Sequence, residues 1–471
     1  MNSKIIYLGI FLLSVFNLNA TIKVASALGD NMVMQRNSDV KIWGTANPNE
    51  KLTITTSWNK AKVSTVANDK GDWLVKAKTT EAGGPYTVTI AAGKEKVQLQ
   101  NILLGEVWLC SGQSNMQMQL LGYSDQPING SNKTILEADN CQLRLFTVKL
   151  SAQSTPQDTC VGKWEVASPK TVGKFSAVGY YFASKLQKAL NVPVGVINSS
   201  WGGSRIEAWI DAETMQKFPE SLAITTKEKT PQHHRAANLY NAMIYPLKNL
   251  SIKGALWYQG ESNRSEYQYY AALQKAMVAK WKSDFELTEF PFYFMQIAPY
   301  SYNNSKDILS GKFYDEQLKA SLDIPNAGMV ATVDLGEEFC IHPAEKEVLG
   351  QRLLYWAMSE TYKVEGLSYK NPIYKSMAVK DSAIVVSFDN VGMGLSAYGK
   401  EITNFEVAGD DKVFYPATAK IKLQSKQVTL TAPEVKKPVA ARYCYINYPS
   451  GKGFLYNTAG LPVLPFRTDN W

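Results

Sequence analysis

Between about residues 101 and 365 the sequence alternates short apolar runs with helical patterns, and this alternation restricts the possible folds more than any other feature. The runs of strand length are residues 192–198, 252–258, 292–297 and 329–334. Helical patterns lie between them, for example at 177–190 and 267–281. Such alternation is typical of a mainly parallel sheet covered by helices on both faces. The sequence therefore predicts an α/β domain whose ligand site lies at the carboxyl ends of the strands.

Two regions with β patterns flank this domain. Residues 21–100 and 366–471 carry short runs of strand length separated by turn residues, a spacing that is typical of small β-sandwiches. We therefore expect a sandwich at 21–100, an α/β domain at 101–365 and a second β-rich domain at 366–471, following a leader at 1–20.

The leader has the pattern of a secretory signal peptide. Lys4 precedes an apolar run at 5–16, and Ala20 offers a small residue for cleavage. That run is shorter than the roughly 18 apolar residues of a spanning helix, and no later stretch approaches that length. We expect a secreted or periplasmic protein that is not embedded in a membrane; the alternative is a retained N-terminal anchor.

Charge and cysteine content exclude some functions. The net charge is +8, but the lysines are scattered without a block of like charge, so the sequence gives no support for a nucleic-acid partner. Of the five cysteines, Cys141 and Cys160 bracket one surface-like segment and could pair in an exported protein. Cys110 lies in an apolar run and is predicted to be a buried thiol. No Cys/His cluster indicates a metal site, and we expect no metal or cofactor.

Residues 105–118 contain the strongest candidate for a nucleophile. An apolar run at 107–110 ends in a turn, and Ser114 then begins a helix-like pattern. A serine at such a junction exposes its hydroxyl and directs backbone N–H groups toward an anion. Ser114 is therefore a candidate nucleophile; the simpler alternative is an ordinary turn with Ser114 as a helix cap.

A nucleophilic serine needs a base, and the chain has three histidines, His233, His234 and His342. His342 precedes Pro343, which favours the start of the helix predicted at 344–362 and would place the imidazole on a rigid loop. His233 and His234 are adjacent in a polar loop, where we expect them at the surface or lining the cleft. His342 is the candidate base; the alternative is a structural histidine.

The developing oxyanion needs donors about 3 Å away. Gly203, in a turn after the run 192–198, can offer its backbone N–H, as can Ser114. Asn263 and Gln259 follow the next apolar run and can offer side-chain N–H groups. The simpler alternatives are a tight turn at Gly203 and a helix cap at Asn263.

Several short motifs occur in order along the chain. They are Gly-Gln-Ser-Asn-Met at 112–116, Trp-Gly-Gly at 201–203, Glu-Ala-Trp at 207–209, Trp-Tyr-Gln-Gly-Glu-Ser-Asn at 257–263 and Ile-His-Pro at 341–343. Together they resemble the sialate O-acetylesterases, which belong to the SGNH, or GDSL-like, hydrolases. The resemblance implies a flavodoxin-like three-layer SGNH hydrolase domain with flanking β-sandwich domains. It also implies metal-free hydrolysis of acetyl esters on sugars.

The resemblance also implies roles for single residues. Ser114 would be the nucleophile and His342 the base, and the N–H groups of Ser114 and Gly203 with the side chain of Asn263 would hold the oxyanion. In the wider superfamily the amide donor falls where this chain has Ser262, so Gln259 is the alternative donor.

The candidate substrate-binding residues are Gln113, Arg205 and Arg264. The two arginines are chosen by position as cations for an acidic sugar, and their alternative role is in surface salt bridges.

One position departs from the family pattern. Cys340 stands where the family carries an aspartate, two residues before the histidine. Asp334, Glu337 or Glu338 could orient His342 instead. A backbone carbonyl could also do so and leave a Ser-His dyad, and we expect the dyad or the backbone-oriented histidine.

The sequence therefore favours a carbohydrate O-acetylesterase that acts on sialic acids, as a sialate 9-O-acetylesterase, through an acetyl-enzyme. The alternatives are an acetylxylan-type polysaccharide acetylesterase and a non-catalytic sugar-binding homologue. The missing aspartate favours the last of these, because loss of an orienting acid can cost orders of magnitude in rate.

Overall fold

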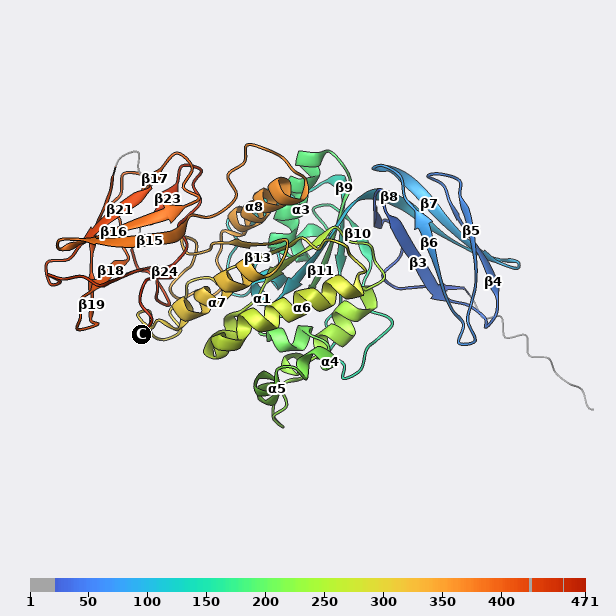
Figure 1. Cartoon of the computed structure of the whole chain (residues 1–471). Helices are drawn as coiled ribbons and strands as arrows, with labels where there is room; N and C mark the ends of the chain where they lie inside the picture. The colour runs from blue at the N-terminus through green and yellow to red at the C-terminus, as the bar shows by residue number, and fades with distance from the viewer. Residues whose placement is uncertain (1–21, 423–425, 452) are drawn as a thin grey trace, which may run out of the picture.

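The computed structural model describes residues 22–422, 426–451 and 453–471. A central region of strands and helices lies between two sheet-rich regions, the N-terminal one in blue and the C-terminal one in orange and red (Figure 1). This arrangement confirms a mixed α/β fold with flanking sheet-rich regions. The predicted signal peptide at 1–20 lies outside the described residues.

The central sheet is parallel across six strands in the order β9-β11-β8-β12-β13-β14. They are β8 (Glu95–Gly112), β9 (Asn140–Thr147), β11 (Val194–Ser200), β12 (Gly254–Tyr258), β13 (Phe292–Met295) and β14 (Ala327–Val330). One antiparallel strand, β10 (Trp164–Ala167), extends the sheet beyond β9. Every residue of β11 and β12 is buried, which confirms the parallel sheet covered on both faces that the apolar runs predicted.

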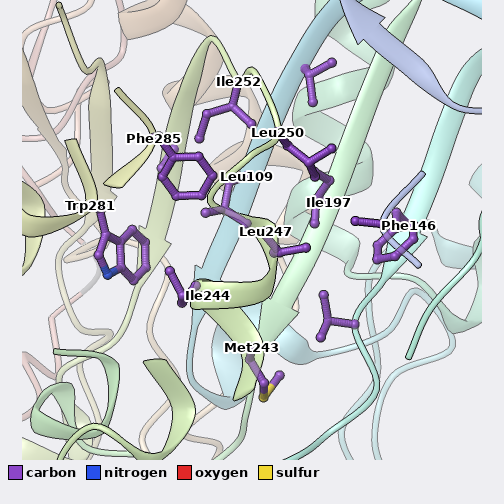
Figure 2. Packing of buried hydrophobic residues seen from close by; sticks show 14 of the residues in the cluster. Leu109, Phe146, Ile197, Met243, Ile244, Leu247, Leu250, Ile252, Trp281 and Phe285 are labelled. Atoms are coloured by element: carbon purple, nitrogen blue, oxygen red, sulfur yellow. The ribbon is translucent and has the colours of Figure 1, made fainter. Parts of the chain in front are cut away.

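Two pairs of long helices cover the two faces. Trp108 and Cys110 of β8 lie in one buried cluster with α3 (Ala177–Leu190) and α8 (Lys346–Trp356). Leu109, between them in sequence, belongs to a second cluster with α6 (Tyr270–Asp284) and α7 (Leu309–Asp323). Figure 2 shows side chains of this second cluster, among them Leu109 and Ile197 of the sheet, Leu247 and Trp281 of α6. Each aliphatic side chain fully buried in this way contributes about 1.5–3 kcal/mol to folding.

Strand β8 joins the N-terminal region to the central sheet. Its first half pairs with β7 (Gly83–Ala92) and β2 (Val33–Gln35), and its second half pairs with β11 and β12. The boundary that we placed between residues 100 and 101 thus lies within one continuous strand. The same buried cluster extends from Ile54 and Ile90 to Leu109, so the two regions share a core.

Of the remaining N-terminal strands, three form a separate sheet in the order β1-β3-β6, and two extend the sheet beyond β7 in the order β4-β5. They are β1 (Lys23–Val24), β3 (Asp39–Thr45), β4 (Lys51–Thr56), β5 (Lys62–Val66) and β6 (Asp72–Lys78). Side chains of β6 alternate between exposed and buried, as expected for a strand with one face on a core.

The C-terminal region has its own core, which includes Ile384, Val407 and Leu430. Its strands are β15 (Ile373–Lys380), β16 (Ala383–Asp389), β17 (Leu395–Ser396), β18 (Phe405–Ala408), β19 (Phe414–Pro416), β20 (Thr418–Ile421), β21 (Gln427–Thr431), β22 (Ala440–Tyr443), β23 (Tyr456–Asn457) and β24 (Phe466–Arg467). The apolar segment near the chain end packs back onto this core, because Val463 and Phe466 are buried in it.

Short helices fill the connections. They are α1 (Ser114–Gln117), α2 (Ser131–Leu136), α4 (Ala212–Met215), α5 (Pro219–Thr225), η1 (Val172–Lys174), η2 (Ile206–Trp209), η3 (Gln232–His234), η4 (Tyr240–Ile244), η5 (Tyr245–Leu247), η6 (Glu261–Tyr269) and η7 (Ala357–Thr361). Among the helices of residues 22–422, 426–451 and 453–471, none is long and apolar enough to cross a membrane.

The disulfide between Cys141 and Cys160 that the sequence would allow is not formed. Both thiols are free; Cys141 at the start of β9 is exposed to solvent, whereas Cys160 is buried and its backbone N–H donates to Ser26 Oγ at 3.2 Å. Cys110 is a buried thiol, as predicted, and burial raises its pKa well above the usual value.

Candidate active site

Ser114 lies at the carboxyl end of β8, where the strand turns into α1. The turn requires Gly112, which has φ +134°, because a Cβ there would lie 2.2 Å from the carbonyl oxygen of Tyr258 on β12. The backbone N–H of Gln113 donates to that same carbonyl at 2.9 Å. Ser114 is therefore the first residue of a short helix at the edge of the sheet, and it is partly exposed.

The glycine turn after β11 packs directly against this serine. Trp201 N–H donates to the Gly112 carbonyl at 3.0 Å, and Gly202 N–H donates to Oε1 of Gln117 at 2.7 Å. A Cβ on Gly202 would lie 3.3 Å from the Cβ of Ser114. Gly203 follows with φ +72°. Within the described part of the chain, the N–H groups of Ser114 and Gly203 donate no hydrogen bond, so both remain available to an anion.

The structure also brings the His342 loop to the Ser114 turn. Asn115 Nδ2 donates to the carbonyl of Ile341, the residue before the histidine, at 3.1 Å. Tyr123 donates from its hydroxyl to the Ser114 carbonyl at 3.3 Å, and its ring lies edge-on to the imidazole with centroids 5.3 Å apart. Two independent contacts thus tie the serine segment to the histidine segment.

A glutamine orients the histidine. Nδ1 of His342 contacts Oε1 of Gln126, a residue 216 positions earlier in the chain. Since an amide oxygen accepts and cannot donate, Nδ1 carries the hydrogen and Nε2 keeps its lone pair. This is the tautomer that a general base needs. No motif in the sequence pointed to Gln126, because it lies in an irregular loop after α1.

None of the three predicted orienting acids has this position. Asp334 is held by Arg352 in a two-pronged ion pair, with oxygen–nitrogen distances of 2.8 and 2.7 Å. Glu337 is exposed, and Glu338 uses its backbone carbonyl to accept from Ser301. The expectation of a backbone-oriented histidine is equally wrong, because the orienting oxygen belongs to a side chain.

Cys340, at the family's aspartate position, places Sγ 3.6 Å from Oε1 of Gln126 and 3.3 Å from the His342 carbonyl. The thiol therefore lies beside the orienting amide without replacing it.

The imidazole lies in a setting that keeps it neutral. Burial, together with the nearby charge of Lys346, lowers the pKa of His342 from 6.5 to about 4. Lys346 is fully buried at the start of α8, and burial lowers its pKa to about 7. Its ammonium group donates to Oδ1 of Asn115, whose Nδ2 donates to Oε1 of Glu261 at 2.7 Å. Burial raises the pKa of Glu261.

This buried chain of Lys346, Asn115 and Glu261 links three segments of the site: α8, the Ser114 turn and the loop after β12. A lysine without solvent contact is costly to bury unless its charge is compensated. The sequence motifs contain Asn115 and Glu261 but gave neither a role, and nothing in the pattern singled out Lys346, which lies between Glu345 and Glu347.

The two predicted amide donors belong to a buried network. Gln259 uses both hydrogens of Nε2, one to the Ser204 carbonyl at 3.1 Å and one to Oδ1 of Asn263 at 2.8 Å. Gln259 therefore has no donor left for an oxyanion, which corrects that alternative. Asn263 is 1% exposed and donates to Oε2 of Glu207 at 2.8 Å; its second amide hydrogen has no partner among the described residues.

The predicted substrate-binding residues are likewise engaged. Gln113 is buried, and its Oε1 accepts from Gly260 N–H at 3.1 Å, so it ties two strand ends together. Arg205 is paired with Glu207 and Glu266 at 3.1 and 3.0 Å. Arg264 donates to Asn447 at 2.9 Å and covers the ring of Tyr302. Each of the three thus has a partner within the protein, and their role in substrate binding stays a prediction.

A cavity of about 630 Å³ lies at the other end of the sheet. Lys253, Pro291 and Ala327, which line it, stand at the amino ends of β12, β13 and β14. It is separate from the Ser114 turn, which lies at the carboxyl ends of these strands.

Comparisons with known proteins identify relatives of this chain. Residues 104–357 match the family model described as carbohydrate esterase, sialic acid-specific acetylesterase. Human sialate O-acetylesterase is 30% identical over 388 residues, which cover 74% of this chain and 73% of that protein. The mouse sialate O-acetylesterase is 27% identical over 419 residues, 75% of this chain and 76% of that protein. A crystal structure of a carbohydrate acetylesterase from Xanthomonas citri superimposes with a TM-score of 0.87 and 32% identity, and covers 96% of this chain and 100% of that one.

Proposed function

The chain belongs to the carbohydrate esterase family of sialic acid-specific acetylesterases, and from that membership we propose that it hydrolyses acetyl esters on sialic acids through a Ser114 acetyl-enzyme. Membership makes it a carboxylic-ester hydrolase. The observation that supports the serine mechanism most is the contact between Nδ1 of His342 and Oε1 of Gln126 beside the Ser114 turn.

In the first half of the reaction, Nε2 of His342 accepts the proton of the Ser114 hydroxyl as Oγ attacks the acetyl carbonyl carbon. The negative charge that develops on the carbonyl oxygen is stabilised by the N–H groups of Ser114 and Gly203, with the remaining amide hydrogen of Asn263 as a third donor. The C–O bond to the sugar then breaks, and the sugar oxygen takes the proton from His342.

In the second half, His342 accepts a proton from water, and the resulting hydroxide attacks the acetyl-enzyme. Acetate leaves as Ser114 regains its proton. Gln126 orients the imidazole throughout but carries no charge, so it stabilises the imidazolium less than a carboxylate would. The site is therefore intermediate between a full triad and a bare dyad.

Two further proposals concern the finer fold of the domains and the location of the protein. We propose a flavodoxin-like three-layer SGNH hydrolase domain at 101–365, supported by the six parallel strands and the helices on both faces. Sandwich-like domains at 21–100 and 366–471 flank it. Export to the periplasm or the outside is proposed from the sequence of residues 1–20.

A second substrate class is favoured by one observation. Both arginines chosen for an acidic sugar are engaged elsewhere, Arg205 by two carboxylates and Arg264 by Asn447 and Tyr302. Because two carboxylates compensate the charge of Arg205, the site suits a neutral, acetylxylan-type polysaccharide. Acetate release from 9-O-acetylated sialic acid and from acetylated xylo-oligosaccharides, measured side by side, separates the two.

The purified chain should release acetate from at least one of these saccharides, and a fluorophosphonate probe should label Ser114. A protein that releases acetate from neither saccharide and takes no label would be a non-catalytic sugar-binding homologue, and the proposal would be wrong.

A further inference from the structure

Three aromatic rings from two distant segments meet beside the Gly203 turn. The rings of Trp201, at the end of β11, and His233, in η3, are stacked with an interplanar angle of 1° and centroids 5.2 Å apart. His234 stands edge-on to His233, with an angle of 80° and centroids 4.4 Å apart. We call Trp201, His233 and His234 the ring cluster.

The ring cluster borders the proposed oxyanion hole. A Cβ on Gly203 would lie 3.9 Å from Nε2 of both His233 and His234. The backbone of Gly203 also interacts with His234 and partly offsets the lowering of its pKa by burial. Since Gly202 packs against Ser114, the rings adjoin the place where the acetyl carbonyl would sit.

The ring cluster lies at the margin of the protein core, because Trp201 packs against the main buried cluster whereas the two histidines do not belong to it. All three side chains are partly exposed, and neither histidine belongs to a buried hydrophobic cluster of the described residues. The ring of His233 has no hydrogen-bond partner within residues 22–422, 426–451 and 453–471. Its polar edge is thus free for a ligand.

The cluster is also uncharged at neutral pH. Burial lowers the pKa values of both histidines below 6.5, and for His234 the charges of His233 and Arg205 lower it further. Glu207 faces the same ring and acts in the opposite direction. Arg205 itself is paired with Glu207 and Glu266. Flat, neutral rings with free N–H or N edges match a sugar, whose C–H face is apolar and whose hydroxyls form hydrogen bonds.

We propose that Trp201, His233 and His234 form the subsite for the pyranose ring that carries the acetyl ester. The inference rests on the proposed function, which supplies the acetyl group at Ser114. The C–H face of the pyranose packs against the exposed part of the ring cluster, and its hydroxyls bond to the ring nitrogens of His233. The cluster thus selects acetylated sugars over simple acetate esters.

The test compares His233→Ala, His233→Phe and Lys229→Ala. The measurement is the ratio of kcat/KM for an acetylated sugar to kcat/KM for ethyl acetate, which has no sugar ring. A lost ring contact should lower this ratio about threefold to tenfold in His233→Ala, with partial recovery in His233→Phe. Lys229→Ala, an exposed change in the same loop, serves as the matched control. An unchanged ratio in His233→Ala would overturn the subsite.

A binding measurement distinguishes a failure of this inference from a failure of the proposed function. Titration calorimetry on Ser114→Ala, with and without His233→Ala, measures affinity for 9-O-acetylated sialic acid and acetylated xylo-oligosaccharide without turnover. Weaker binding in the double variant supports the subsite even if the parent chain releases no acetate. Equal binding, or no binding of either sugar to Ser114→Ala, overturns the subsite even if acetate is released.

Discussion

Oε1 of Gln126 contacts Nδ1 of His342, so a neutral amide, and not the aspartate that the family resemblance led us to expect at residue 340, holds the proposed base. The amide fixes the ring orientation and the tautomer, as a carboxylate does, but it adds no negative charge to stabilise the imidazolium. Burial and then the nearby ammonium of Lys346 lower the pKa of His342, and the amide has no charge that would oppose them.

Gln126→Ala should lower kcat/KM about 10-fold to 100-fold, because a hydrogen bond to a group that becomes charged contributes about 1.5–3 kcal/mol. Steady-state acetate release with the best sugar substrate provides the measurement. Gln126→Glu restores a carboxylate, so its activity should match or exceed that of the parent, with the acid limb of the pH profile at higher pH. Wild-type activity in Gln126→Ala would refute the orienting role.

The acid limb of kcat/KM should have an apparent pKa near 4. His342 acts as a base when neutral, and its pKa is lowered to about 4, so activity should persist below pH 6.5 and be lost as the pH falls through about 4. An apparent pKa near 6.5 for the acid limb would contradict the position of the imidazole, which is buried and close to Lys346.

Lys346→Met tests that setting directly. Removing the positive charge should raise the pKa of His342 and move the acid limb to higher pH, and kcat should fall because Asn115 loses its partner. Lys185→Met, which removes a surface ion pair with Glu347 on the same helix pair, is the control and should leave the limb in place. A limb that moves equally in both variants would show that Lys346 has no specific effect.

Gly112→Ala should destabilise the fold by more than about 3 kcal/mol, because left-handed backbone strain adds to a clash with the Tyr258 carbonyl. Gly130 is the matched control, because it has φ +74° but a Cβ there would meet no atom within 4 Å. Gly130→Ala should therefore cost only about 1–2 kcal/mol. Urea unfolding measures both values. Equal losses in the free energy of unfolding would show that the clash between a Cβ at Gly112 and the Tyr258 carbonyl of β12 adds no cost.

Reducing agent should leave the melting temperature unchanged, since Cys141 and Cys160 are both free thiols. Thiol titration of the unfolded chain should find every cysteine present in the sequence in its reduced form. A drop in melting temperature on reduction would indicate a disulfide that this structure does not contain.

Much of the fold could be predicted from local pattern. The helix expected at 177–190 is α3 (Ala177–Leu190), and the run 252–258 contains β12, because apolar periodicity directly reports buried faces. The continuity of β8 could not be predicted, since its two halves pair with different sheets and look like separate strands in sequence.

The site was only partly predictable for a similar reason. Ser114, Gly203 and His342 stand next to strand ends or helix starts, which the pattern reveals. Gln126 lies in an irregular loop and reaches His342 through tertiary structure alone. The roles of Gln259 and Arg205 depended on which neighbours their side chains meet, and no spacing in the sequence encodes that.

The proposed mechanism requires Ser114 as the nucleophile, and acetate release by Ser114→Ala tests this role most directly. Against the parent chain and Ser131→Ala as a control, the variant should lose at least about 10⁴-fold in kcat at unchanged melting temperature. Turnover within tenfold of the parent would contradict the serine mechanism.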